Sequence, residues 1–179
     1  ARDTMRAAPT DSDIVIVEVD GRSLQDVATW PWPRETYAKA VAELDRLGAK
    51  QIAFDIEFSA QSTPEQDGIF AKALAEAEAS IVLPTFRQVN GASDDQVVSE
   101  ALPIPELREH AFLASVNVLP DASGQITHYG FGTVTQNVPR PSLASMISGT
   151  AGDITDTFRV DQAISPASFD RISYVDLLD

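Results

Sequence analysis

In the first half of the chain, segments with the hydrophobic pattern of a buried strand alternate with segments that have the pattern of a helix. Residues 13–20, DIVIVEVD, form a valine- and isoleucine-rich run that predicts a buried strand in a parallel sheet. Residues 33–50 carry apolar side chains at helical spacing, with Pro33 at the first helical position and Gly48 placed to end the helix. Residues 51–58, QIAFDIEF, return to the strand pattern. This order predicts a right-handed β-α-β crossover.

The same unit then repeats, and a polar segment interrupts it. Residues 63–66, TPEQ, predict a capped start for an alanine-rich helix that runs to about residue 79. Residues 80–86, SIVLPTF, predict a third strand. Residues 87–100 are polar and contain Asn-Gly, a turn signal, so we expect a mobile loop there.

The second half predicts a change from parallel to antiparallel pairing. Residues 112–119, FLASVNVL, predict a fourth strand, and the alternating residues 125–136 predict its partner in a hairpin at one edge of the sheet. Short helices are predicted at 105–111 and 141–148, a last strand at 156–164, and a final helix with Ser173 as its cap. The predicted fold class is α/β, with a mostly parallel central sheet, helices on both faces and an antiparallel hairpin at one edge. We expect one domain over residues 1–179, with an irregular polar segment at 1–12.

Composition limits the classes of partner. Hydrophobic residues make up 44% and charged residues 22% of the chain, which is ordinary for a soluble globular domain. The formal net charge of -14 repels phosphate backbones, so we expect no nucleic-acid partner. The absence of cysteine excludes thiol catalysis and thiolate metal sites, and favours an oxidising compartment. No apolar run approaches the roughly 18 residues of a membrane span.

Polar side chains near the strand ends are the candidate ligand-binding residues. In open parallel sheets, ligands bind beyond the carboxyl ends of the strands. Asp20 closes the first strand, Asp55 lies late in the second and Asn117 lies in the fourth. Trp32 and Arg34 follow the first strand, so they are expected over the same edge. These five residues together predict one ligand pocket.

Packing explains the same residues without a ligand. Asp20 could cap the turn that follows it, and Arg34 could pair with Asp20 or Asp55, because a buried carboxylate needs a partner. Trp30 and Trp32 could cover the core. Both explanations stay open at this point.

A small hydrolase-like α/β enzyme is the alternative from a different class. Asp55 and Glu57 are two residues apart, so on a strand they point the same way, and paired carboxylates can perform acid–base work or hold a cation. However, the two histidines are isolated, and neither a nucleophile elbow nor a phosphate-binding loop is present. We therefore predict no catalytic residue, no metal site and no cofactor.

Several motifs in one order resemble a known family. They are DIVIVEVDGRSL, WPWPRETYAKAVAELDRLGAKQIAFDIEFS, IVLP, ASVNVLPDASGQI, PSLA and ISYVDLL. Together they resemble the type-2 CHASE domain, the cyclase- and histidine-kinase-associated sensory extracellular module, over nearly the whole chain. The most specific pieces are the strand ending in Asp20, the Trp-Pro-Trp-Pro-Arg segment and AFDIEFS.

The resemblance implies a sensory function outside the cytoplasmic membrane of a bacterium. It implies transmembrane helices on both sides of this domain, with residues 1–12 next to the membrane. The periplasmic domain would relay a signal from an unidentified small-molecule or protein ligand to a cytoplasmic adenylate cyclase, diguanylate cyclase or histidine kinase. We expect a homodimer, because such output domains generally work as dimers. A dimerisation module without a ligand is a further alternative.

Overall fold

The structure, a computed structural model, describes residues 13–27, 29–90, 97–118, 120–121 and 123–179. The predicted irregular segment 1–12 therefore lies outside the described residues. The helices are α1 (Gly21–Asp26), α2 (Arg34–Arg46), α3 (Pro64–Glu76), α4 (Pro105–Arg108), α5 (Leu143–Ser148) and α6 (Tyr174–Leu178), with a 3-10 turn η1 (Pro166–Ser168). The strands are β1 (Val15–Glu18), β2 (Gln51–Ala53), β3 (Ser80–Asn90), β4 (Val97–Ala101), β5 (Phe112–Ser115), β6 (His128–Gly130), β7 (Gly132–Thr135), β8 (Val138–Pro141), β9 (Thr157–Arg159) and β10 (Asp170–Ser173).

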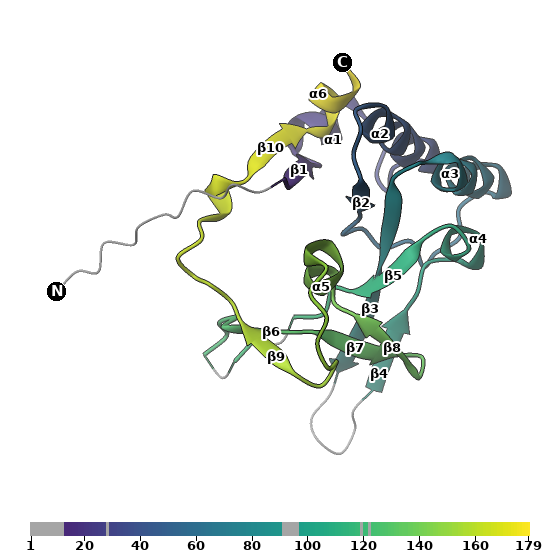
Figure 1. Cartoon of the computed structure of the whole chain (residues 1–179). Coiled ribbons are helices and arrows are strands. Elements are labelled where there is room, and N and C mark those ends of the chain that lie inside the picture. The colour runs from purple at the N-terminus through teal and green to yellow at the C-terminus, as the bar shows by residue number, and fades with distance from the viewer. Residues whose placement is uncertain (1–12, 28, 91–96, 119, 122) are drawn as a thin grey trace.

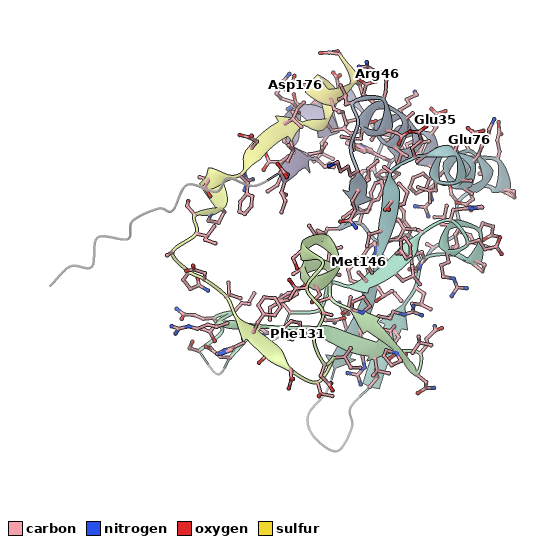
Figure 2. All side chains as sticks on the ribbon, viewed as in Figure 1. Glu35, Arg46, Glu76, Phe131, Met146 and Asp176 are labelled. Carbon is pink, nitrogen blue, oxygen red and sulfur yellow. The ribbon has the colours of Figure 1, made fainter. Side chains whose placement is uncertain are left out.

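The central sheet is parallel, with β3 between β2 and β5. Figure 1 shows α2, α3 and α4 on one side of β3 and α5 on the other, where α5 contacts β2 and β5. Side chains follow the same division: Glu35 and Glu76 lie on the helical side, whereas Met146 and Phe131 lie across the sheet (Figure 2). The predicted α/β class is therefore confirmed.

Helix ends follow the predicted local signals. Thr63 Oγ1 accepts the backbone N–H of Gln66 at 3.2 Å, as its predicted cap position requires. Gly48 follows the end of α2 with φ 85°, a conformation that glycine adopts without strain. The Gln66 side chain, in turn, accepts the N–H of Glu35 at 3.0 Å. One helix therefore caps the start of the other.

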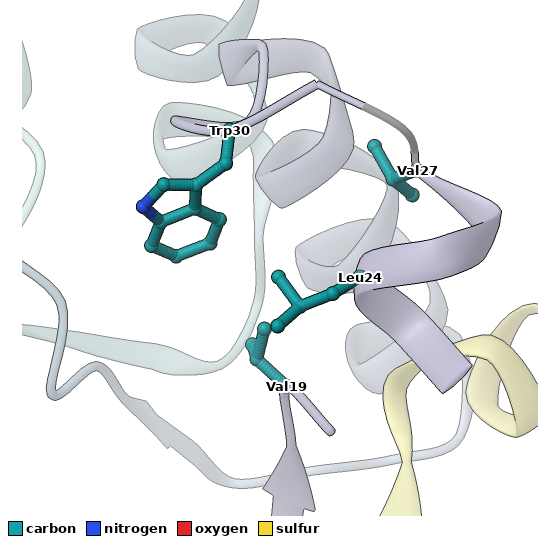
Figure 3. A pocket seen from close by; sticks show the side chains of 4 residues that line it. All are labelled: Val19, Leu24, Val27 and Trp30. Atoms are coloured by element: carbon teal, nitrogen blue, oxygen red, sulfur yellow. The ribbon is translucent and has the colours of Figure 1, made fainter. Parts of the chain in front are cut away.

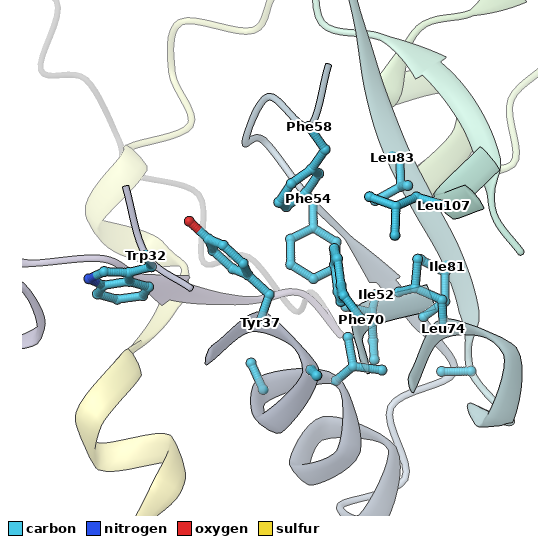
Figure 4. Packing of buried hydrophobic residues seen from close by; sticks show 14 of the residues in the cluster. Trp32, Tyr37, Ile52, Phe54, Phe58, Phe70, Leu74, Ile81, Leu83 and Leu107 are labelled. Carbon is cyan, nitrogen blue, oxygen red and sulfur yellow. The ribbon is translucent and has the colours of Figure 1, made fainter. Parts of the chain in front are cut away.

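Aromatic side chains fill the space between these helices and the sheet (Figure 4). The rings of Tyr37, Phe54, Phe58 and Phe70 lie 5.1 to 6.4 Å apart between centroids, in edge-on and tilted pairs. Aromatic pairs at such distances add to the stabilisation from buried area. This cluster is the centre of the hydrophobic core.

The first strand differs from its prediction. β1 is parallel, as expected, but within the described residues it pairs only with β10, in a separate two-stranded sheet. Val15 is exposed and the rest of β1 is half-buried, so the prediction of a buried strand is wrong. The physical reason is the missing second neighbour, because a strand is fully buried only when the sheet continues and is covered on both faces.

The prediction of a loop at residues 87–100 is wrong for both ends of this segment, which are strands. β3 continues to Asn90 and pairs antiparallel with β4, from Phe86 opposite Ala101. The intervening residues 91–96 lie outside the described residues. A polar composition is compatible with such a strand pair, because an antiparallel pair can have one face in solvent.

The edge hairpin is present, but its strands are not the predicted ones. β5 pairs parallel with β3, and the predicted strand at 125–136 is divided into β6, which pairs with β9, and β7, which pairs with β8. Gln136 and Asn137 connect β7 to β8 with φ of 49° and 60°, which is the geometry of a two-residue hairpin turn. At Gly132 a Cβ atom would lie 2.3 Å from the Arg140 carbonyl oxygen, so only glycine allows this close pairing.

Candidate functional site

Asp20 is the cap of a helix that the sequence pattern did not predict. α1 begins directly after it, and Asp20 Oδ1 accepts the backbone N–H and the hydroxyl of Ser23, both at 2.8 Å. The same oxygen accepts the hydroxyl of Ser173 at 3.1 Å. These donors, first the Ser23 N–H, lower the pKa of Asp20. The alternative that Asp20 caps the turn after the first strand is therefore confirmed.

The end of the chain is attached to α1 through the same residues. Ser173 is the residue before α6, but its hydroxyl donates to Asp20 instead of capping α6. Arg22 of α1 makes two hydrogen bonds, of 2.8 and 2.7 Å, to Asp176 of α6, which is labelled in Figure 2. Sequence analysis missed this contact, because nothing local relates residues so far apart.

The two tryptophans of the Trp-Pro segment have opposite environments. Trp32 is 4% exposed, and its ring lies 4.6 Å from that of Tyr174. Trp30, which precedes a cis peptide bond, is 60% exposed and packs edge-on against Trp32, with centroids 5.8 Å apart. The prediction that the tryptophans cover the core is confirmed for Trp32 and is wrong for Trp30.

Trp30 forms one wall of an apolar pocket of about 470 Å³ (Figure 3). Its other lining residues are Val19, which follows β1, Leu24 of α1 and Val27 at the end of α1. A pocket of this size can hold a small molecule, and this lining favours an uncharged, apolar surface. Val19 precedes the Asp20 cap in the chain, and Trp30 packs on the buried Trp32, so the pocket is adjacent to both through these two lining residues.

Aromatic contacts connect this pocket to α6. Trp30 packs on Trp32, and Trp32 packs on Tyr174, the first residue of α6. The Tyr174 hydroxyl donates to the Thr36 carbonyl oxygen of α2 at 2.7 Å. Burial, and then Tyr37, raise the pKa of Tyr174 to about 12, so the hydroxyl stays protonated at neutral pH. The rings of Trp32 and Tyr174 therefore connect Trp30 to α6.

Arg34 does not pair with Asp20 or Asp55, so that expectation is wrong. Its Nε donates to Asp67 Oδ1 at 3.2 Å, its Nη2 donates to the Ala60 carbonyl oxygen at 2.6 Å, and its guanidinium lies 4.8 Å from the centre of the Phe58 ring. Asp67 also accepts the Ser62 N–H at 2.9 Å. Arg34 and Asp67 together fasten the segment after β2 to α3.

Asn117 and Asp55 lie apart from the pocket at Trp30. Asn117 Oδ1 accepts the backbone N–H of Arg87 and the hydroxyl of Ser115, each at 3.0 Å, and its amide donates to the Arg87 carbonyl oxygen. It thereby joins the segment after β5 to Arg87 within β3. Asp55 is exposed; after burial, its charge is the second cause that raises the pKa of Tyr129.

The single pocket predicted for the five ligand-binding residues is not one of the two pockets described here. Neither of the two pockets described here is lined by Asp20, Trp32, Arg34, Asp55 or Asn117. Glu57 lines the second, polar pocket, so it does not share a pocket with Asp20 or Asp55. In the described part of the chain, no group of three or more histidine, aspartate or glutamate residues could hold a metal ion. A ligand-binding role for the five residues stays a prediction.

Comparisons with known proteins place the chain in a family. The family model of the CHASE2 domain matches residues 1–179, the whole chain. No curated protein and no solved structure gives a match. Among the helices of the described residues, none has the length and apolarity needed to cross a membrane. Since the family match covers every residue, the chain belongs to the CHASE2 family of extracellular sensory domains, which are found in signalling receptors and are not catalytic.

Proposed function

We propose that this chain is the periplasmic sensory input domain of a bacterial transmembrane receptor, which relays a signal to a cytoplasmic cyclase or kinase. The family supplies the sensory role. The observation that carries the proposal is the line of contacts from the apolar pocket through Trp30, Trp32 and Tyr174 into α6. A pocket connected by packed rings to the last helix of the domain can couple binding to a displacement of that helix.

The relay requires two arrangements of α1 and α6 with different affinities for a stimulus. A ligand at the Trp30 pocket, small molecule or protein, that favours one arrangement by about 1.4 kcal/mol shifts their ratio tenfold. In the full-length receptor, membrane helices next to β1 and α6 carry this shift inward. The receptor works as a homodimer in this proposal. The same shift therefore also changes how its two cytoplasmic output domains lie relative to each other.

The location is tested with reporter fusions to the full-length protein. Alkaline phosphatase, which is active only outside the cytoplasm, and green fluorescent protein, which is fluorescent only inside, are inserted in separate fusions directly after residue 179. We expect phosphatase activity without fluorescence. Fluorescence without phosphatase activity would show that the domain lies in the cytoplasm and that the proposed location is wrong.

The relay is tested by a disulfide between α1 and the start of α6. The hydroxyl oxygens of Ser23 and Ser173 are 3.1 Å apart, so cysteines at these two positions are close enough to bond. The chain contains no other cysteine. We expect the disulfide of Ser23→Cys/Ser173→Cys to raise the free energy of unfolding by about 2 kcal/mol. We also expect it to change the output rate of the full-length receptor about tenfold between oxidised and reduced membranes.

The single variants Ser23→Cys and Ser173→Cys are the matched controls, because each loses one hydroxyl but cannot form the bond within the chain. Their output rates should be the same before and after reduction. A double variant that is fully oxidised, as measured by thiol labelling, and that keeps the output rate of its reduced form would contradict the proposed relay through α1 and α6.

A further inference from the structure

A polar pocket of about 750 Å³ lies where several segments of the chain meet. The segment after β2, the strand β4, the residues from β4 into α4 and the turn between β7 and β8 all line it. Its hydroxyl and amide groups come from Ser59, Gln61, Ser99 and Gln136, and three further lining side chains are charged. Cavities of this volume are typical of small-molecule sites.

The walls of this pocket are held together by hydrogen bonds between elements. The backbone N–H of Ile104 donates to the Phe58 carbonyl oxygen at 3.0 Å, which ties the residue before α4 to the segment after β2. Both residues are buried. On another wall, the Gln136 N–H donates to Glu100 at 2.8 Å and ties the β7–β8 turn to β4. The charged side chains of the pocket therefore stand on fixed backbone.

One of the three charged side chains is already compensated. One carboxylate oxygen of Glu100 pairs with Arg87 at 3.4 Å, and the other accepts the Gln136 N–H. Glu100 is therefore engaged at both oxygens, and the charges left to a ligand are those of Glu57 and Arg108.

Glu57 and Arg108 carry opposite charges and line the same pocket, yet they do not pair with each other. Glu57 Oε1 accepts the Ser59 hydroxyl, and Oε2 has no partner in the part of the chain that the structure describes. The Arg108 side chain makes neither an ion pair nor a hydrogen bond with any described residue. By contrast, five other arginines each pair with a carboxylate: Arg22, Arg34, Arg46, Arg87 and Arg171. The pocket thus offers one negative and one positive group that a ligand can contact together.

We propose that the polar pocket binds a small zwitterion, an amino acid, whose ammonium group contacts Glu57 and whose carboxylate contacts Arg108. A guanidinium presents paired N–H donors that match two carboxylate oxygens, and an ammonium group donates to a free carboxylate oxygen. The net charge of -14 attracts cations in general, so Arg108 is the group that selects a cation which also carries a carboxylate. This pocket shares no lining residue with the Trp30 pocket, so the proposal goes beyond the proposed relay and does not rest on it.

The experiment adds the standard amino acids, one at a time, to the 179-residue chain. Binding is measured by calorimetry and by the melting temperature, because a ligand that binds only the folded state raises that temperature. For each amino acid that binds, two analogues follow: the amine without the carboxylate and the acid without the ammonium group. For serine these are ethanolamine and 3-hydroxypropanoate. We expect each analogue to bind at least about tenfold more weakly, since each loses a charge-assisted contact.

Glu57→Gln and Arg108→Gln are each expected to weaken binding of the amino acid at least about tenfold. The analogues then show which charge each residue contacts. Glu57→Gln should not weaken binding of the acid, and Arg108→Gln should not weaken binding of the amine. The matched controls are Glu76→Gln and Arg159→Gln, which change the net charge equally at exposed residues that line neither pocket. They should keep the affinity within about twofold.

The proposal is overturned if none of the amino acids raises the melting temperature at concentrations up to about 20 mM. It is also overturned if the amine binds the unmutated chain as tightly as its amino acid does, since this would indicate a general attraction of cations to an acidic protein. Equal weakening by the pocket variants and by the control variants would overturn it as well.

Discussion

Replacing Arg34 with alanine is expected to lower the free energy of unfolding by about 3–5 kcal/mol. The side chains of Arg34 and Asp67 are only 10% and 8% exposed. Removing the arginine leaves the Asp67 carboxylate buried without its counter-ion, and the Ala60 carbonyl oxygen loses a 2.6 Å hydrogen bond. Urea unfolding monitored by circular dichroism measures the change.

Arg46→Ala is the control for this substitution, because Arg46 forms an exposed ion pair with Glu43 one turn away on the same helix as Arg34. It should cost no more than about 0.5 kcal/mol. A cycle of Arg34→Ala, Asp67→Asn and the double variant isolates the coupling between the two side chains. If Arg34→Ala left stability unchanged but altered signalling, Arg34 would belong to a binding site instead.

Trp32→Ala is expected to destabilise the domain by about 3–5 kcal/mol, whereas Trp30→Ala should cost under about 1 kcal/mol. The two residues are close in sequence but differ in exposure, at 4% and 60%. Truncating Trp32 leaves a cavity against Tyr37 and Tyr174, and truncating Trp30 mainly removes a pocket wall that faces solvent. The same urea titration compares both variants.

The paired variants also separate packing from sensing. In the full-length receptor, Trp30→Ala should change the response to a stimulus while the domain stays folded. Phe112→Ala, which removes a ring that is equally exposed on β5, is the control and should leave the response unchanged. Equal losses of stability from Trp30→Ala and Trp32→Ala would show that the exposed ring is structural and would remove the basis for the Trp30 pocket.

Elements with a local cause could be predicted from the sequence. Gly48 and Thr63 act within one turn of their own helix, so the end of α2 and the start of α3 follow from neighbouring residues. Pro33, predicted as the first helical residue, is instead the cap position before Arg34. Strand pairing has no such local cause. The burial of β1 depends on β10, and the partner of β7 depends on a turn at Gln136 and Asn137 that lacks the usual glycine.

The sequence predicted which types of residue lie near the strand ends, but not which partners they contact. Asp20 and Asn117 are polar residues that follow strands, but the Oδ1 atom of each already accepts hydrogen bonds, from α1 and β10 for Asp20 and from β3 and β5 for Asn117. Arg34 was expected to have an acidic partner, and Asp67 is an acidic residue that sequence spacing could not distinguish from many others. The orientation of Trp30, which decides that it lines a pocket, depends on contacts that only the folded chain provides.

The parallel pairing of β1 with β10 also governs when the domain can be completed. Val15 lies opposite Asp170, so nearly the whole domain must be synthesised before the first strand can acquire its partner. Contacts of such long sequence separation form slowly, because the loop between them must be closed first. Until then β1 remains an unpaired apolar edge, the kind of segment that aggregates or engages chaperones. The last residues of the chain therefore complete the packing around β1, and truncation before β10 would remove both its strand partner and the buried side chains of Tyr174 and Leu177.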